Sequence, residues 1–233
     1  LCSRDTKSAW EIFYEGIRAV FKSKYLLCIV SIVGFYEIVS TIIDYQFAEI
    51  LSRMFKSPHD MAGFHGKVLF IAQIGSLLVQ LLMTPYILKR YGQFPALLFL
   101  PLTLLLGSVA FMVFLWPLII ITSIGMEAVF SYSINQVSKE TLYVPLDNIA
   151  KVKGKAFIDM FVFRGAKAIG AVILLSYTLW LSHHGFTPHF LMSINIVAIA
   201  IWLFSIVYIR KMIGNSYSAV RINPTIRGRS SEI

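Results

Sequence analysis

Ionisable and strongly polar side chains recur inside long apolar stretches of this 233-residue sequence. Placing a charge in an apolar environment is costly unless the charge is paired or faces a polar cavity. Such residues are therefore candidates either for solute binding or for internal ion pairs. The set with the clearest chemistry is Glu37, Gln73, Glu127, Asp159, Arg164 and Lys167.

Several of these residues belong to polar stripes whose spacing puts each stripe on one face of a helix. Residues three, four and seven positions apart lie on the same helical face. The three stripes are Glu37, Ser40, Thr41 and Asp44; Gln73, Ser76, Gln80 and Thr84; and Ser123, Glu127, Ser131 and Asn135. Three helices are thus expected to turn polar faces toward a shared space.

A fourth apolar stretch combines charges of both signs with small residues. At about 100° per residue, Lys155, Asp159, Arg164 and Lys167 fall within one half of the helical wheel. Arginine and lysine suit an anionic ligand such as a phosphate group. The structural alternative, in which these charges form ion pairs that only hold the helices together, stays open at this point.

Enzyme chemistry and metal binding have little support in the sequence. The apolar stretches contain no Ser/His/Asp arrangement, no His/Glu metal spacing and no glycine-rich phosphate loop. Neither of the two cysteines, Cys2 and Cys28, has a neighbour at metal-ligand spacing. We therefore predict no enzyme activity, no cofactor and no metal site.

The composition identifies the elements that must position these residues. Hydrophobic residues make up 57% of the chain and charged residues only 14%, whereas soluble domains carry about 25% charged residues. An apolar helix of roughly 20 residues crosses a bilayer. We therefore predict an all-α polytopic membrane protein, a six-transmembrane-helix bundle. The expected spans are 25–43, 66–84, 95–112, 117–136, 156–180 and 190–209.

The predicted domain organisation follows from these spans. Residues 1–24 are a cytoplasmic linker with an amphipathic helix over 8–22, residues 25–210 are the bundle, and residues 211–233 are a basic cytoplasmic tail. The long apolar run between the third and fourth spans is expected to break at Trp116 and Pro117, because proline suits a first helical turn and tryptophan the membrane interface. Residues 44–65 and 182–189 are expected to be outer loops.

The net charge of +9 has an orientation explanation. Lys and Arg are concentrated before the first span, in the loops 89–90 and 139–155, and after the last span. An excess of Lys and Arg marks the cytoplasmic side, which places both termini in the cytoplasm and suits a bacterial inner membrane. The positive net charge is therefore explained without a nucleic acid partner. The expected partner of the bundle is membrane lipid.

The stripes place four helices around a polar path and leave the third and sixth spans facing outward. Six helices with both ends inside are expected of one half of a major-facilitator-type transporter, which pairs two six-helix halves. The sequence starts at Leu1 rather than Met. We therefore expect an N-terminal six-helix half that is missing from this chain.

Two regions carry a resemblance to a known family. The first is the helix around Glu37, with the run Gly34-Phe35-Tyr36-Glu37-Ile38-Val39. The second contains the stretches Lys139-Glu140-Thr141-Leu142-Tyr143-Val144-Pro145, Lys153-Gly154-Lys155-Ala156-Phe157-Ile158-Asp159 and Arg164-Gly165-Ala166-Lys167. With these regions the sequence resembles the C-terminal half of the ATP:ADP antiporter family, the nucleotide transporters of plastids and intracellular bacteria, and the helix around Glu37 is similar to the acidic helix that opens that half.

The resemblance implies a secondary transporter that exchanges nucleotides, with Glu37 and Lys167 at charged positions needed for transport. The expected substrate is a small anionic solute such as a nucleotide, moved by alternating access. Two other functions stay open: a proton-coupled carrier of a different solute, with Glu37 or Glu127 as the proton site, and a membrane scaffold domain that transports nothing.

Overall fold

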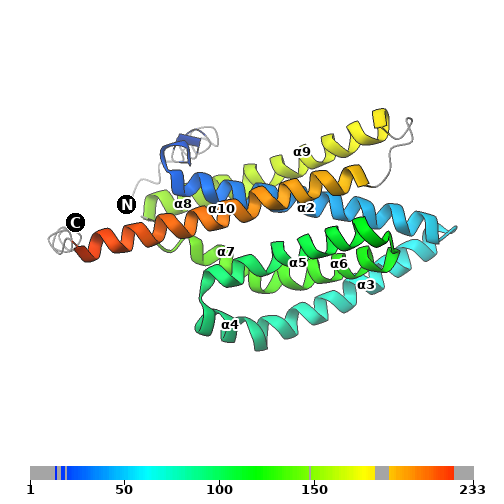
Figure 1. Cartoon of the computed structure of the whole chain (residues 1–233), viewed down its shortest axis with the longest axis horizontal. Coiled ribbons are helices and arrows are strands. Elements are labelled where there is room, and N and C mark those ends of the chain that lie inside the picture. Colours follow the sequence, from blue (N-terminus) through cyan, green and yellow to red (C-terminus); the bar gives the residue numbers. More distant parts are fainter. Residues whose placement is uncertain (1–13, 15–16, 19, 147, 182–188, 223–233) are drawn as a thin grey trace, which may run out of the picture.

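A computed structural model describes residues 14, 17–18, 20–146, 148–181 and 189–222. Within this part of the chain every regular element is a helix (Figure 1). The α-helices are α2 (Lys24–Met54), α3 (Pro58–Leu78), α4 (Thr84–Tyr91), α5 (Gln93–Phe114), α6 (Pro117–Phe130), α7 (Gln136–Leu142), α8 (Asn148–Phe157), α9 (Phe163–Ser176) and α10 (His189–Ile222). The π-helical turns are η1 (Val79–Met83), η2 (Ser131–Asn135), η3 (Ile158–Val162) and η4 (Tyr177–Leu181).

Five of the described helices are long and apolar enough to cross a membrane. They are Lys24–Met54, Pro58–Tyr91, Gln93–Phe114, Pro117–Leu142 and His189–Met212. The predicted span 156–180 is also helical, within the continuous run α8, η3, α9 and η4, but it is not one of the five. This run carries Arg164 and Lys167 near its middle, and these charges lower its apolar character.

The predicted outer loop over residues 44–65 was wrong. Helix α2 continues to Met54, and only residues 55–57 separate it from α3. Apolar residues recur at helical spacing beyond position 44, where Phe47 and Leu51 are buried in the core. Glu49, two positions from both Phe47 and Leu51, lies on another face of the same helix, and neither Asp44 nor Glu49 ends the helix.

Two helix boundaries were predicted correctly. Helix α6 begins at Pro117 directly after Trp116, whose backbone is extended. Helix α10 begins at His189, next to the expected start at 190, and runs on to Ile222, past the predicted end of the bundle. The amphipathic helix over 8–22 lies largely outside the described residues.

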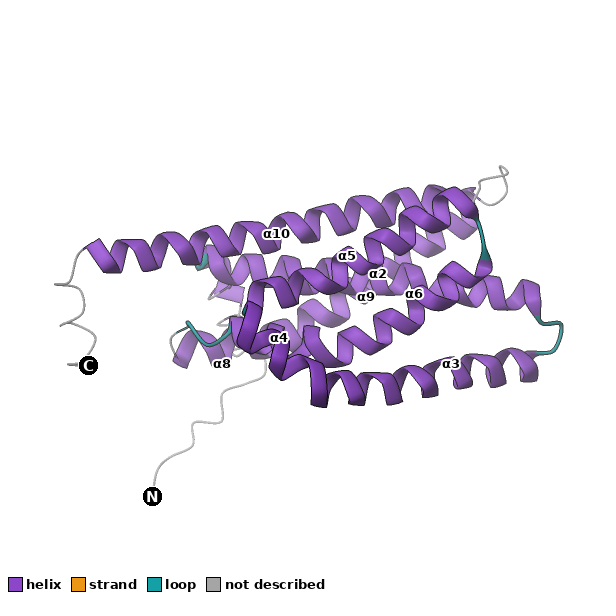
Figure 2. Cartoon of the chain, turned by 60° about the horizontal axis from the view of Figure 1, so that its bottom comes forward, coloured by secondary structure: helices purple, strands orange, loops and turns teal. Residues whose placement is uncertain are grey.

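Helix α2 occupies the centre of the bundle and packs against α6, α9 and α10 (Figures 1 and 2). Helix α9 packs mainly on α2, and α3 packs mainly on α6, so that α3 and α9 flank the α2–α6 pair. The start of α2 and the end of α10 lie at the same end of the bundle (Figure 1). The predicted basic regions at the start of α2, around α4 and α8, and near the end of α10 share that end.

Helices α5 and α10 use their few polar residues to bond to neighbouring helices. Asn195 of α10 donates a hydrogen bond of 3.0 Å to Ser108 of α5. The hydroxyls of Ser31 on α2 and Ser205 on α10 lie 2.8 Å apart. These polar residues therefore hold helices together within the bundle.

The close contact between α2 and α9 gives a first testable prediction. A Cβ atom added to Gly170 would lie 3.1 Å from two carbons of Thr41, whose hydroxyl is fixed by a 2.7 Å bond to the carbonyl of Glu37. Gly170→Val should therefore push the helices apart and lower the free energy of unfolding by about 1–3 kcal/mol. Gly165→Val is the matched control, since the same helix leaves space there. Equal thermal unfolding midpoints for the two variants would contradict the prediction.

Candidate functional site

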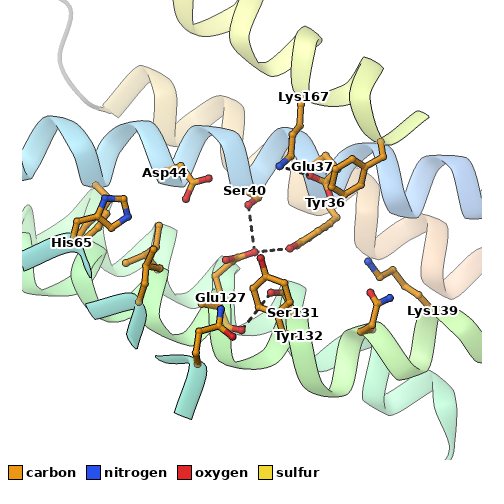
Figure 3. Close-up of a pocket in the computed structure, with 17 residues that line it drawn as sticks. Tyr36, Glu37, Ser40, Asp44, His65, Glu127, Ser131, Tyr132, Lys139 and Lys167 are labelled. Atoms are coloured by element: carbon orange, nitrogen blue, oxygen red, sulfur yellow. Dashed lines mark hydrogen bonds and ion pairs between the residues drawn. The ribbon is translucent and has the colours of Figure 1, made fainter. Parts of the chain in front are cut away.

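A cavity of about 500 Å³ lies inside the bundle between α2, α3, α6–α7 and α9 (Figure 3). These are the four helices to which the sequence assigned polar faces. Helices α5 and α10 contribute no lining residue. The polar lining residues are Tyr36, Glu37, Ser40, Asp44, His65, Gln73, Glu127, Ser131, Tyr132, Gln136, Lys139 and Lys167.

Glu127 is held by two hydroxyl groups from α2. The Tyr36 hydroxyl donates a hydrogen bond of 2.6 Å to Oε1 of Glu127, and the Ser40 hydroxyl donates one of 3.3 Å to the same atom (Figure 3). Glu127 is buried, with only 8% of the residue exposed. These bonds tie α6 to α2 across the cavity and stabilise a carboxyl group away from bulk solvent.

Glu37 and Lys167 form an ion pair between α2 and α9. Nζ of Lys167 lies 3.7 Å from Oε2 of Glu37, and the lysine side chain is 54% exposed while the glutamate side chain is 3% exposed. The other oxygen of Glu37, Oε1, is buried and has no hydrogen-bond partner among the described residues. The pair is long for a charge-assisted hydrogen bond, so Lys167 is open to a competing anion.

Lys139 is a cavity residue that the sequence analysis missed. It was assigned to a basic loop, but it lies in α7, lines the cavity, and places Nζ 5.0 Å from the centre of the Tyr36 ring. A cation over an aromatic face is attracted by the ring. Lys139 and Lys167 therefore bring two positive groups to the cavity from helices on different sides (Figure 3).

The π turn η2 explains why the predicted stripe on this helix is only partly correct. Ser123, Glu127 and Ser131 step by four residues, and the stripe was expected to continue at Asn135. A π turn adds one residue and rotates the following helix, so Asn135 is buried outside the cavity while Gln136 and Lys139 line it. The change from Asn135 to Gln136 and Lys139 as lining residues follows from the register shift within Ser131–Asn135. The periodicity of the sequence does not show that shift.

The structure does not bring all six predicted site residues together. Glu37, Gln73, Glu127 and Lys167 line the cavity. Asp159 and Arg164 are exposed and lie outside its lining. Lys155, which was expected on the same charged face as Asp159, forms its ion pair with Glu140, with Nζ 2.5 Å from Oε2. Asp159 lies within the turn η3, which comes between Lys155 of α8 and the α9 residues Arg164 and Lys167, so the predicted single charged face is interrupted.

The bond between Tyr36 and Glu127 gives a second prediction. Tyr36→Phe should lower the free energy of unfolding by about 1.5–3 kcal/mol, because a buried carboxyl group loses its shortest hydrogen bond. Tyr132→Phe is the control, since Tyr132 lines the same cavity but is 60% exposed and can bond to water. Chemical or thermal unfolding in detergent measures both effects. Equal stability of the two variants would show that the bond contributes nothing.

Apolar helices around a polar, charged cavity define an integral membrane protein of the transporter class. Residues 3–213 match the family described as TLC ATP/ADP transporter, and the chain belongs to this family. Among the described residues, no three His, Cys, Asp or Glu side chains gather as a metal site.

The relatives of this chain are carriers from bacteria and plants. It is 26% identical over 218 residues to "ADP,ATP carrier protein 1" of Chlamydia trachomatis, covering 85% of this chain and 41% of that protein. It is 28% identical over 209 residues to the "Plastidic ATP/ADP-transporter" of Solanum tuberosum, covering 81% of this chain and 33% of that protein. The chain thus spans a third to two fifths of these relatives. No solved structure matches it.

Proposed function

We propose that this chain is the C-terminal half of a secondary transporter that exchanges nucleotides of the ATP/ADP type across a membrane. The observation that carries the proposal is the pair of lysines, Lys139 and Lys167, on a polar cavity inside an apolar bundle. Lysine ammonium groups bind phosphate as point charges. The carrier relatives support a nucleotide over other organic anions.

The charges of the cavity suggest how a substrate is bound and released. In the empty cavity Glu37 pairs with Lys167 at 3.7 Å. A phosphate group that enters between Lys167 and Lys139 replaces this partner, and Glu37 regains the lysine when the substrate leaves. A nucleotide that enters from the other side of the membrane can then displace Glu37 from Lys167 in the same way.

The two flanking helices are the proposed contact with a missing partner half. The continuous run of α3 and η1 exposes large apolar residues, including Phe70, Ile74 and Leu81, and α9 exposes Arg164 and Val172. We assign the run 148–181 as the sixth crossing, since it packs along α2 beside the other five helices. Rocking of two such halves about the cavity gives alternating access.

We place the protein in a bacterial inner membrane with both termini in the cytoplasm, residues 1–24 and 211–233 flanking the bundle. The support is that the basic regions of the sequence fall at one end of the helices, while Arg53 and Lys56 lie at the other. Lys and Arg mark the cytoplasmic side of membrane proteins. Protease protection of each terminus in sealed membrane vesicles tests this orientation.

A second candidate function is a proton-coupled carrier of a different solute. The observation that favours it is Glu127, a buried carboxyl group on the cavity wall with two hydroxyl donors. Uptake driven by a proton gradient and abolished by an uncoupler would support this function. A scaffold domain without transport is the third candidate, and a soluble domain in place of six upstream helices would support it.

The experiment that separates these functions is exchange in proteoliposomes containing the full-length protein. Vesicles loaded with ADP, with phosphate or with buffer alone are supplied with external radiolabelled ATP. We expect ATP uptake only into vesicles loaded with ADP, and no response to an uncoupler. Uptake into empty vesicles that depends on a proton gradient would favour the proton-coupled carrier, and no uptake under any condition would favour the scaffold.

A further inference from the structure

A second cavity, of about 390 Å³, lies at the opposite end of the bundle from the basic regions. It is formed where α2 and α5 end and where α6 and α10 begin, with Arg53, Phe111, Pro117 and His189 in its lining. It shares no lining residue with the central cavity. Its volume falls in the range of small-ligand sites.

Three of the polar residues of this second cavity come from one face of α2, and the fourth, His189, comes from α10. Gln46, Glu49 and Arg53 are spaced by three and four residues and all line the cavity. Gln46 is 2% exposed, and neither its amide nitrogen nor its amide oxygen has a partner among the described residues. A buried amide left without partners costs free energy, so a ligand with both a donor and an acceptor would satisfy it.

Glu49 and Arg53 add one charge of each sign at the same place. Nη2 of Arg53 lies 2.5 Å from Oε1 of Glu49, with the arginine side chain 70% exposed. Apart from His189, the remaining wall is apolar and includes Ile50, Phe111 and Leu115. A carboxylate and a guanidinium side by side above an apolar wall complement a zwitterion that carries a hydrocarbon chain.

The position of the cavity indicates that its ligand comes from the bilayer. All five candidate membrane-crossing helices of the described residues have one end on this side of the bundle, among them those that end at Met54 and Phe114. Trp116, between Leu115 and Pro117, is 67% exposed, and exposed tryptophan favours the layer of lipid headgroups. Headgroups are therefore present at the mouth of the cavity.

We infer that this cavity binds one phosphatidylethanolamine molecule. The ammonium group of the lipid donates to Glu49 and to the Gln46 carbonyl oxygen, the phosphate accepts from Arg53, and an acyl chain covers the apolar wall. Phosphatidylcholine fits less well, because its quaternary ammonium has no N–H to donate. An anionic headgroup without an amine competes with Glu49 for Arg53 and offers Glu49 no ammonium group in return.

The test uses the full-length protein and a phosphatidylethanolamine that carries a photoactivatable diazirine near its headgroup. We expect cross-links to peptides containing residues 46–54 and 111–117, and a ten-fold excess of plain phosphatidylethanolamine should compete them away. The same excess of phosphatidylcholine or of free phosphoethanolamine should not. Cross-links spread over the whole membrane surface, or equal competition by all three, would overturn the inference.

Variants add a second readout that is independent of transport. Arg53→Gln and Gln46→Leu should each reduce the specific cross-link at least five-fold. Lys56→Gln, at an exposed basic residue of the same end that does not line the cavity, should leave it unchanged. Because Arg53 is exposed, its variant should fold even if Gln46→Leu does not. An Arg53→Gln protein that cross-links like the native protein would also overturn the inference.

Discussion

Lys167→Gln should reduce nucleotide exchange in proteoliposomes by about 10- to 100-fold. A hydrogen bond to a charged group contributes about 1.5–3 kcal/mol, and each 1.4 kcal/mol is a factor of ten. In our proposal Lys167 provides such a contact to phosphate, and its side chain lines the cavity and is 54% exposed. Glutamine keeps most of the side-chain length but removes the charge.

The control for this experiment is Lys89→Gln. Lys89 is an exposed lysine of α4 that does not line the cavity, so it reports the loss of a positive charge at the surface. Loss of activity with Lys167→Gln but not with Lys89→Gln supports a local contact with the substrate. Exchange at the native rate in both variants would show that Lys167 does not bind the nucleotide.

Glu37→Gln should separate binding from turnover. The amide keeps the shape of the side chain but no longer competes with the substrate for Lys167, which lies 3.7 Å away. We expect the apparent KM for the nucleotide to fall by about ten-fold and the maximal exchange rate to fall by a similar factor, because release from the site becomes slower. Initial rates over a range of external nucleotide concentrations measure both constants.

Asp60→Asn is the matched control for the acidic variant, since Asp60 is exposed at the start of α3 and does not line the cavity. If Glu37→Gln leaves both constants unchanged, Glu37 is not the competitor that the proposal requires. If both Glu37→Gln and Lys167→Gln transport normally, the proposed site itself is wrong. A lower rate with an unchanged KM would assign Glu37 to the conformational step rather than to binding.

The helical fold and the choice of cavity-lining helices could be read from the sequence because both depend on local periodicity. Apolar stretches of membrane-crossing length indicated the helices, and stripes around Glu37, Gln73 and Glu127 indicated which faces are polar. The structure places these residues on one cavity. The length of α2 was underestimated because Asp44 and Glu49 resemble loop residues when their helical face is unknown.

The rest of the site depends on features that periodicity does not contain. The turn η2 changes the register of α7 and brings Lys139 into the cavity, whereas η3 interrupts the face that was expected to join Asp159 to Lys167. Regular wheels assume 3.6 residues per turn throughout. Each π turn departs from 3.6 residues per turn at one place. The helical face predicted for every residue after that turn is therefore rotated from its true position.

The extra residue in η2 determines the rotational orientation of helix α7 relative to the neighbouring helices. A π turn holds one residue more per turn than the α-helix around it. Deleting one residue within Ser131–Asn135 would rotate α7 by about 100°, exchanging the ammonium group over the Tyr36 ring for a different side chain. The surplus residue thus determines that the positively charged Lys139 faces the inner wall.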